Sequence, residues 1–268
     1  MIELNKIYNE DCLEGMKRID DKSIDMILCD LPYGTTTCKW DTIIPFKPLW
    51  EQYERVIKDN GVIVLTASQP FTTKLISSKI DLFKYTIVWK KDKSKATNFT
   101  HAKNSPLKVH EDICVFSKGS IAHKTNINRM EYNPQGLIPY GKTVKGNSKG
   151  GKNNEHSIDR PSHKAEYVRE FTNYPTSIIE FGTDFKQEHP TQKPVALFEY
   201  LIRTYTNENE TVLDNCIGSG TTAIACININ RNYIGFELDK KYFDIANKRI
   251  DELKRMRNSM ILGRRKVY

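Results

Sequence analysis

Three features are missing from this sequence: a long apolar run, a closely spaced cysteine pair and an apolar segment near its start. A membrane-spanning helix needs roughly 18 apolar residues, and no apolar run here, the strongly apolar Val62–Leu65 included, approaches that length. The segment Met1–Cys12 carries acids and no apolar signal core. We therefore expect a cytoplasmic protein that makes no membrane contact.

None of the six cysteines belongs to a CxxC pair. Cys29 and Cys226 lie within apolar runs, a setting that is typical of reduced and buried thiols. We therefore expect neither a disulfide framework nor a zinc or other metal site in this chain.

The composition is that of a folded protein with an excess of positive charge. The chain has 268 residues, of which 38% are hydrophobic and 10% aromatic, enough for one large α/β domain or two small ones. Its 41 basic and 33 acidic residues give a net charge of +8. This charge favours a polyanion such as nucleic acid as the partner, although a basic surface without any partner remains the alternative.

Strand-like and helical segments alternate along the chain. An apolar run, Ser23–Cys29, predicts a strand that stops at Asp30–Gly34, and the spacing within Pro48–Lys58 predicts a helix that Asn60-Gly61 ends. This alternation is typical of an α/β fold, with a mostly parallel sheet and helices on both faces. Further strands are expected at 62–66, 83–89, 110–116, 211–214 and 233–237, and further helices at 71–78, 194–205, 221–229 and 242–257.

The middle of the chain has a different character. Residues 118–188 hold seven of the fourteen glycines and show little hydrophobic periodicity, and the stretch 142–154 contains no acid. A long irregular segment in a compact enzyme is more often functional than idle, although a solvated surface insertion is the alternative. We divide the chain at residues 1–117, 118–188, 189–252 and 253–268, the last being a basic tail.

A glycine turn near the C-terminus is typical of a nucleoside-cofactor site. The expected strand 211–214 runs into Gly218-Ser219-Gly220, which opens a helix, and Glu237 ends the next strand. The glycines allow close approach of a ligand, and the Glu237 carboxylate is placed to accept hydrogen bonds from both ribose hydroxyls. Ala223 occupies the third-glycine position of the dinucleotide fingerprint, so a cofactor without a pyrophosphate fits equally well.

A second motif, Asp30-Leu31-Pro32-Tyr33, follows a buried strand, where an open α/β sheet places its ligands. The motif has the parts that methylation of an exocyclic base amine requires. Such an amine is a poor nucleophile because its lone pair is delocalised into the ring, so its two hydrogens need acceptors that favour a tetrahedral nitrogen. The Asp30 carboxylate and the Leu31 carbonyl provide acceptors for its two hydrogens. Pro32 fixes the backbone, and the Tyr33 ring can stack on a base swung out of the duplex. An ordinary turn at the end of a strand is the alternative.

These motifs, in this order, resemble the β class of amino-methylating DNA methyltransferases, and the match runs from Ile7 to Ile250 apart from 118–188. The class has an Asp-Pro-Pro-Tyr-type motif first, then a target-recognition region, then the glycine motif. Leu31 stands where proline is usual, a change that its carbonyl role tolerates. Glu10 stands where the early Gly-Asp-Cys segment normally has glycine.

The resemblance implies a Rossmann-like fold that binds S-adenosylmethionine. It makes 1–117 the catalytic part, 118–188 a target-recognition insertion and 189–252 the cofactor-binding part of one domain. It also implies direct in-line methyl transfer, with Asp favouring adenine N6 over cytosine N4. The catalytic residues are then Asp30, Leu31, Pro32 and Tyr33. The cofactor-binding residues are Asp11, Cys12, Asp30, Thr191, Lys193, Asp214, Cys216, Gly218, Gly220, Thr221, Thr222, Glu237 and Leu238, with Thr191 and Lys193 near the methionine carboxylate.

The implied substrate is double-stranded DNA, in a bacterial or phage setting. The resemblance leaves open a homodimer and a restriction endonuclease partner. An RNA or small-molecule methyltransferase and a catalytically silent nucleic-acid-binding module are the alternatives. The expected DNA-binding residues are Lys90, Lys91, Lys93, Lys95, Arg129, Arg160 and Arg169, with His123, Asn126 and His163 as further candidates in the insertion.

Overall fold

The structure is a computed structural model that describes residues 2–34, 41–92, 94, 96–122, 128–145, 166–182 and 192–264. It divides the chain into two compact units, each of which is described by itself. The main unit contains Met1–Asn133 and Ser177–Tyr268, and the smaller unit is Pro134–Thr176.

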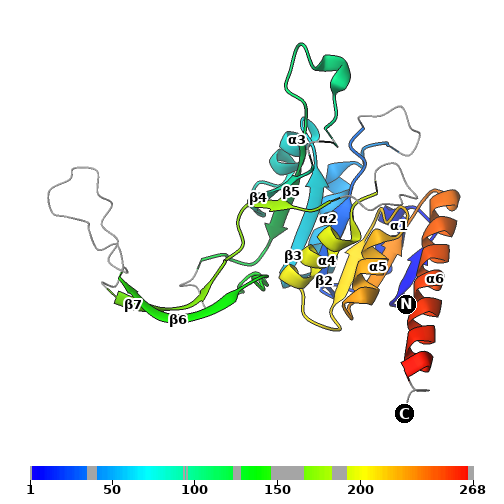
Figure 1. Ribbon diagram of the computed structural model, residues 1–268. Coiled ribbons are helices and arrows are strands. Elements are labelled where there is room, and N and C mark those ends of the chain that lie inside the picture. Colours follow the sequence, from blue (N-terminus) through cyan, green and yellow to red (C-terminus); the bar gives the residue numbers. More distant parts are fainter. Residues whose placement is uncertain are drawn as a thin grey trace. The chain divides into compact units, whose positions relative to one another are not determined.

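The main unit is built on a mixed sheet of eight described strands in the order β1-β10-β9-β2-β3-β5-β4-β8 (Figure 1). Neighbouring strands pair in parallel, except that β5 is antiparallel to both β3 and β4. The prediction of a mostly parallel sheet is therefore confirmed. The strands are β1 (Lys6–Tyr8), β2 (Ile24–Asp30), β3 (Ile57–Ala67), β4 (Phe83–Lys90), β5 (His110–Ser117), β8 (Ile178–Glu180), β9 (Thr211–Asp214) and β10 (Asn232–Phe236).

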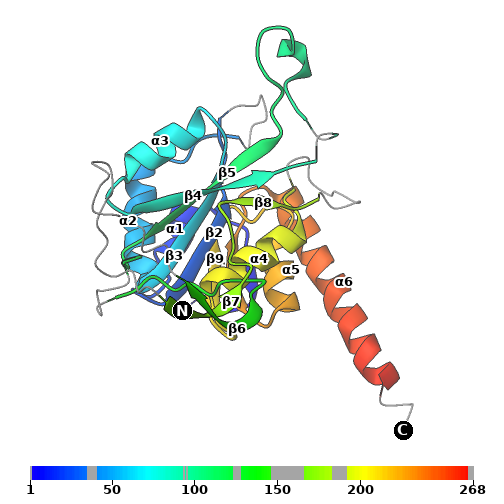
Figure 2. The same ribbon diagram turned by 60° about the vertical axis from the view of Figure 1, so that its left-hand side comes forward.

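Helices cover both faces of this sheet (Figure 2). Along β2, Met26 and Leu28 enter one apolar cluster while Ile27 and Cys29 enter another, because successive side chains of a strand point to opposite faces. The first cluster includes residues of α4 (Val195–Tyr205), α5 (Thr221–Asn228) and α6 (Lys240–Arg264). The second includes residues of α1 (Cys12–Met16), α2 (Phe46–Val56) and α3 (Phe71–Ser78).

The predicted end of the helix within Pro48–Lys58, at Asn60-Gly61, is wrong. The helix α2 ends at Val56, and Ile57 is already extended and paired with Ile24 of β2. Asn60-Gly61 therefore lies inside β3 instead of ending a helix. A Cβ on Gly61 would come within 2.9 Å of the Asp25 carbonyl oxygen, so this glycine permits close approach of two strands rather than a turn.

The long helix α6 extends the expected 242–257 segment in both directions, so that the segment assigned to a basic tail continues as helix through Arg264. Basic residues recur in its sequence from Lys240 to Arg257. Within the described ranges, no helix combines the length and the apolar character needed to cross a membrane.

The smaller unit contains an antiparallel ribbon of β6 (Ile138–Lys145) and β7 (Glu166–Thr172), in which Lys142 is opposite Arg169. The segment 118–188 thus includes this ribbon and also β8, which pairs with β4 in the main sheet. The low hydrophobic periodicity of this segment gave no indication of these strands.

The parallel strands place the chemistry at one edge of the main sheet. Asp30 ends β2, Asp214 ends β9 and Glu237 follows β10. Because β5 runs in the opposite direction, its first residues lie beside the last residues of β4, with Glu111 paired to Trp89. Residues far apart in the sequence therefore meet at this edge.

Candidate active site

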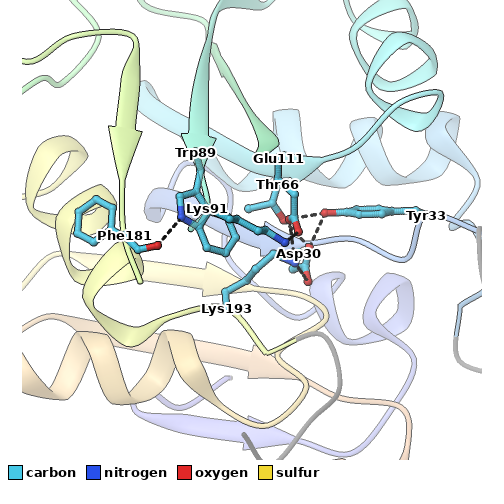
Figure 3. A network of polar contacts seen from close by, with 8 residues as sticks. All are labelled: Asp30, Tyr33, Thr66, Trp89, Lys91, Glu111, Phe181 and Lys193. Atoms are coloured by element: carbon cyan, nitrogen blue, oxygen red, sulfur yellow. Dashed lines mark hydrogen bonds and ion pairs between the residues drawn. The ribbon is translucent and has the colours of Figure 1, made fainter. Parts of the chain in front are cut away.

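The Asp30 carboxylate lies at the centre of a polar network (Figure 3). Its Oδ1 accepts hydrogen bonds from the hydroxyl groups of Tyr33, at 2.7 Å, and Thr66. Its Oδ2 accepts from the Lys193 ammonium at 2.6 Å. Three side chains, two of them from distant parts of the chain, therefore hold the Asp30 carboxylate, and the Asp30 side chain is 22% exposed.

Local structure fixes the rest of the Asp30–Tyr33 motif. Thr66 lies opposite Asp30 in the β2–β3 register. Leu31 is 4% exposed and belongs to the apolar cluster under α2 and α3. The Tyr33 ring stacks on Phe71 of α3, with centroids 5.1 Å apart and planes at 26°. The motif is thus anchored on both sides of the carboxylate, which is the preorganisation that a reacting group needs.

Sequence reasoning missed Glu111, which joins the network from β5. Its Oε1 pairs with the Lys91 ammonium, and its Oε2 lies 3.3 Å from Lys193 Nζ. The two charges of Asp30 and Glu111 flank Lys193, whose side chain is 6% exposed. An acid in the expected strand 110–116 was the available signal, but only the antiparallel pairing brings it to Asp30.

The charge states follow from this arrangement. Burial lowers the pKa of Lys193, but the charges of Asp30 and Glu111 outweigh it, so the pKa lies above its usual value. For Glu111 the two effects have the opposite signs. Burial raises its pKa, but the charges of Lys193 and Lys91 lower it by more, so the pKa lies below its usual value. Both groups are therefore charged at neutral pH.

The lysines expected to meet DNA phosphate differ in their surroundings. Lys91 is in the network, 19% exposed, with its ammonium 4.8 Å from the Trp89 ring centroid. Lys90 is 48% exposed and pairs with Glu180 of β8. The Trp89 indole donates to the Phe181 carbonyl at 3.0 Å, which fastens the chain after β8 beside the network (Figure 3).

The remaining DNA candidates are scattered. Arg129 is exposed in the main unit, and Arg169 is exposed on β7 of the smaller unit. The other candidates lie outside the described residues: Lys93, Lys95, His123, Asn126, Arg160 and His163.

The glycine turn after β9 forms the second half of the site. Gly218 and Gly220 have φ values of +54° and +85°, a region that favours glycine. A Cβ on Gly220 would lie 3.0 Å from Ala246 of α6, whereas one on Gly218 would meet no atom of the described residues nearer than 4.0 Å. Gly220 is therefore required for packing, and Gly218 leaves the turn open to a ligand.

Two carboxylates are held by this turn. Glu237 accepts from the backbone N–H groups of Gly218, at 2.9 Å, and Asp239, at 2.8 Å, and burial raises its pKa. Asp214 accepts from the Thr222 hydroxyl and from the Cys216 N–H. It is 3% exposed, and burial raises its pKa to about 7.

The early Asn9–Cys12 segment lies beside these groups. Asn9 donates to the carbonyl oxygens of Glu237 and Leu238, at 2.8 and 3.0 Å. Asp11 caps the N-terminus of α1, and Cys12 is buried next to Asn215. The structure thus brings together the expected cofactor residues near Asn9–Cys12, the glycine turn and Glu237–Leu238. Thr191 is outside the described ranges.

Known proteins share this sequence pattern and this fold. The DNA methylase family model matches residues 24–248. The Type II methyltransferase M1.MboII of Moraxella bovis is 28% identical over 94% of this chain and 99% of that protein.

Two solved structures show the same fold. The M1.HpyAVI–SAM complex is 24% identical, with a TM-score of 0.57, over 91% of this chain and 98% of that one. The PvuII cytosine-N4-specific DNA methyltransferase is 14% identical, with a TM-score of 0.62, over 96% and 93%. With the family model matching most of its length, this chain belongs to the DNA methylase family of N6 and N4 methyltransferases.

Proposed function

We propose that this protein transfers a methyl group from S-adenosylmethionine to the exocyclic N6 of an adenine flipped out of duplex DNA. The observation that carries the proposal is the anchored Asp30 carboxylate at the same sheet edge as the open glycine turn and Glu237. Asp30, which can orient an amine, and Glu237, which can orient a nucleoside cofactor, therefore lie at the same edge of the main sheet.

The residues of the glycine turn suit S-adenosylmethionine, which supplies an activated methyl group when bound. Beyond the two backbone hydrogen bonds that it accepts, the Glu237 carboxylate has lone pairs that can accept hydrogen bonds from ribose hydroxyls. The exposed Leu238 side chain offers an apolar contact for the adenine of the cofactor. At Gly218, no atom of the described residues lies nearer than 4.0 Å to where a Cβ would be, so a ligand can approach this backbone closely. The other residues that we assign to the cofactor are Asp11, Cys12, Thr191, Lys193, Asp214, Cys216, Gly220, Thr221 and Thr222, whereas we assign Asp30 to the target amine.

The target amine would be held by Asp30 and the Leu31 carbonyl, which accept hydrogen bonds from its two N–H groups and favour a tetrahedral nitrogen. Asp30 also stabilises the positive charge that develops on this nitrogen. Pro32 fixes the backbone between them, and the Tyr33 ring offers a face for the flipped base. Most of the rate enhancement then comes from aligning the nitrogen with the methyl group.

A direct transfer needs no cysteine nucleophile, and the described thiols fit this mechanism. Burial raises the pKa of Cys29 and that of Cys114 to about 12. Such thiols remain protonated at neutral pH and are weak nucleophiles. Attack by a thiolate on a base ring carbon is therefore disfavoured.

The choice of adenine rests on the leading acid, because the class implies adenine for Asp and cytosine for Ser. The PvuII cytosine-N4 enzyme shares this fold, so the architecture alone does not select the base. Duplex DNA is the favoured substrate because the chain is basic and belongs to the DNA methylase family. Lys90 and Arg129, both exposed, are the described main-unit residues that we assign to phosphate contact.

The test is transfer of radiolabelled methyl from S-adenosylmethionine to unmethylated duplex DNA, with digestion and mass identification of the nucleoside. Wild type and Asp30→Ala are compared. N6-methyladenine from the wild type alone is the expected result. N4-methylcytosine would overturn the choice of base, and transfer to RNA alone would overturn the choice of substrate.

A further inference from the structure

The Lys193–Asp30 pair presents a problem for the proposed reaction. Asp30 Oδ2 already accepts from the Lys193 ammonium at 2.6 Å, and Oδ1 accepts from two hydroxyl groups. A carboxylate provides about four lone-pair directions, so little of Asp30 is free for an incoming amine. A buried ammonium beside the amine would also oppose the positive charge that develops during transfer.

A second acceptor for Lys193 lies within reach. Glu111 Oε2 is 3.3 Å from Lys193 Nζ, and this oxygen is buried and accepts no hydrogen bond from any described residue. A buried carboxylate oxygen without a hydrogen bond is costly. Lys193 can gain a full hydrogen bond there by a small movement away from Asp30 (Figure 3).

We propose that Glu111 is a positioning residue for the methyl transfer: it receives the Lys193 ammonium when the target amine arrives, and thereby frees Asp30 Oδ2 for that amine. Lys193 keeps a negative partner throughout, so its charge is never left unpaired. Glu111 does not touch the reacting atoms and acts through Lys193. This inference rests on the proposed function and extends it to a residue of β5.

Glu111 is held independently of Lys193, as such a role requires. Its Oε1 pairs with Lys91, whose ammonium also lies over the Trp89 ring. The β4–β5 pairing sets Glu111 directly opposite Trp89. The acceptor therefore stays in place whether Lys193 is bonded to Asp30 or to Glu111.

The groups facing Lys193 set how its charge responds to pH. Asp30 comes from β2 and Glu111 from β5, while the Tyr33 ring centroid is 5.9 Å from Nζ. Lys108 contributes a more distant positive charge. Replacing Glu111 with Gln removes one of the two negative partners, so the pKa of Lys193 falls in the variant.

The experiment uses single-turnover methylation of unmethylated duplex DNA by the full chain, with S-adenosylmethionine affinity measured by calorimetry. We expect Glu111→Gln to slow methyl transfer by about 10- to 100-fold at neutral pH, with the cofactor Kd changed less than about threefold. As the pH is raised into the alkaline range, the variant's Lys193 should lose its proton before the wild type's does, so the deficit should shrink several-fold. A merely structural role would not produce this recovery.

Asp112→Asn is the matched control, because Asp112 is the next acid on β5 and accepts instead from the Thr72 hydroxyl. If Glu111→Gln does not fold, Glu111→Asp keeps the charge but shortens the reach to Lys193, and it should give a smaller loss that still exceeds that of Asp112→Asn. Equal rates for Glu111→Gln and Asp112→Asn, or a loss that does not change with pH, would overturn the inference. A failure of the wild type to produce any methylated nucleoside would instead overturn the proposed function.

Discussion

The two halves of the sheet edge hold their carboxylates in different ways. At the glycine turn, Glu237 is held by backbone N–H groups no more than nineteen residues away. At the Asp30–Tyr33 motif, the Asp30 carboxylate is held by side chains, one of them 163 residues away. Backbone donors make a fixed cradle, whereas an ammonium flanked by two acids can change partners. We infer that the first half binds and that the second half reacts.

The largest expected effect separates these two roles at Asp30. Asp30→Ala removes the acceptor for the target amine, so turnover should fall by at least about 10³-fold. Cofactor affinity should stay within a few fold, because the glycine turn is untouched. Calorimetry and single-turnover kinetics measure the two quantities. Loss of both together would assign Asp30 to cofactor binding or to folding.

Glu237→Ala should produce the opposite pattern. The proposed role of Glu237 gives it two charge-assisted hydrogen bonds to ribose hydroxyls, so their loss should weaken cofactor binding about 100-fold. The rate at saturating cofactor should remain close to that of the wild type. Thermal unfolding of the same sample checks that the turn at Gly218 survives. An unchanged Kd in a folded variant would remove Glu237 from the cofactor site.

The buried Asp214 makes the binding half sensitive to pH. Its pKa is about 7 in the folded protein against 3.8 in the unfolded chain, so the native state binds the proton more tightly. The free energy of unfolding should therefore fall as pH rises from about 4 to 7, by up to about 4 kcal/mol from this group. Urea unfolding across this range should show a smaller fall for Asp214→Asn. Parallel curves for the two proteins would contradict the raised pKa.

Tyr33→Phe probes the reacting half more gently. The variant keeps the ring that stacks on Phe71 and loses the hydroxyl that donates to Asp30. We expect about tenfold slower transfer with unchanged cofactor affinity, since Thr66 and Lys193 still hold the carboxylate. Tyr33→Ala should be slower still in the same assay. If Phe and Ala behaved alike, the ring would have no role with the flipped base.

The smallest effect is expected at the surface. Lys90→Ala should weaken DNA binding only a few fold, because the exposed lysine is partly neutralised by Glu180. The slope of log affinity against log salt should decrease by about one if Lys90 contacts a phosphate. A titration of duplex DNA at several salt concentrations provides the slope, and an unchanged slope would exclude the contact.

Local patterns predicted much of this protein, and distant pairings account for what they missed. The glycine turn and the Asp30–Tyr33 motif each occupy one short stretch, so residue type and spacing were sufficient to find them. Glu111 reaches the site only because β5 runs antiparallel to its neighbours, which a short apolar run does not reveal. Gly61 was misjudged because a glycine that permits close strand approach looks, in sequence, like one that ends a helix.

The most direct test compares Asp30→Ala with Glu237→Ala in one set of measurements: cofactor Kd and single-turnover methylation at saturating S-adenosylmethionine. We predict that Asp30→Ala binds cofactor normally and does not react, and that Glu237→Ala binds weakly and reacts once saturated. If each folded variant lost affinity and rate alike, the division of this sheet edge into a binding half and a reacting half would be wrong.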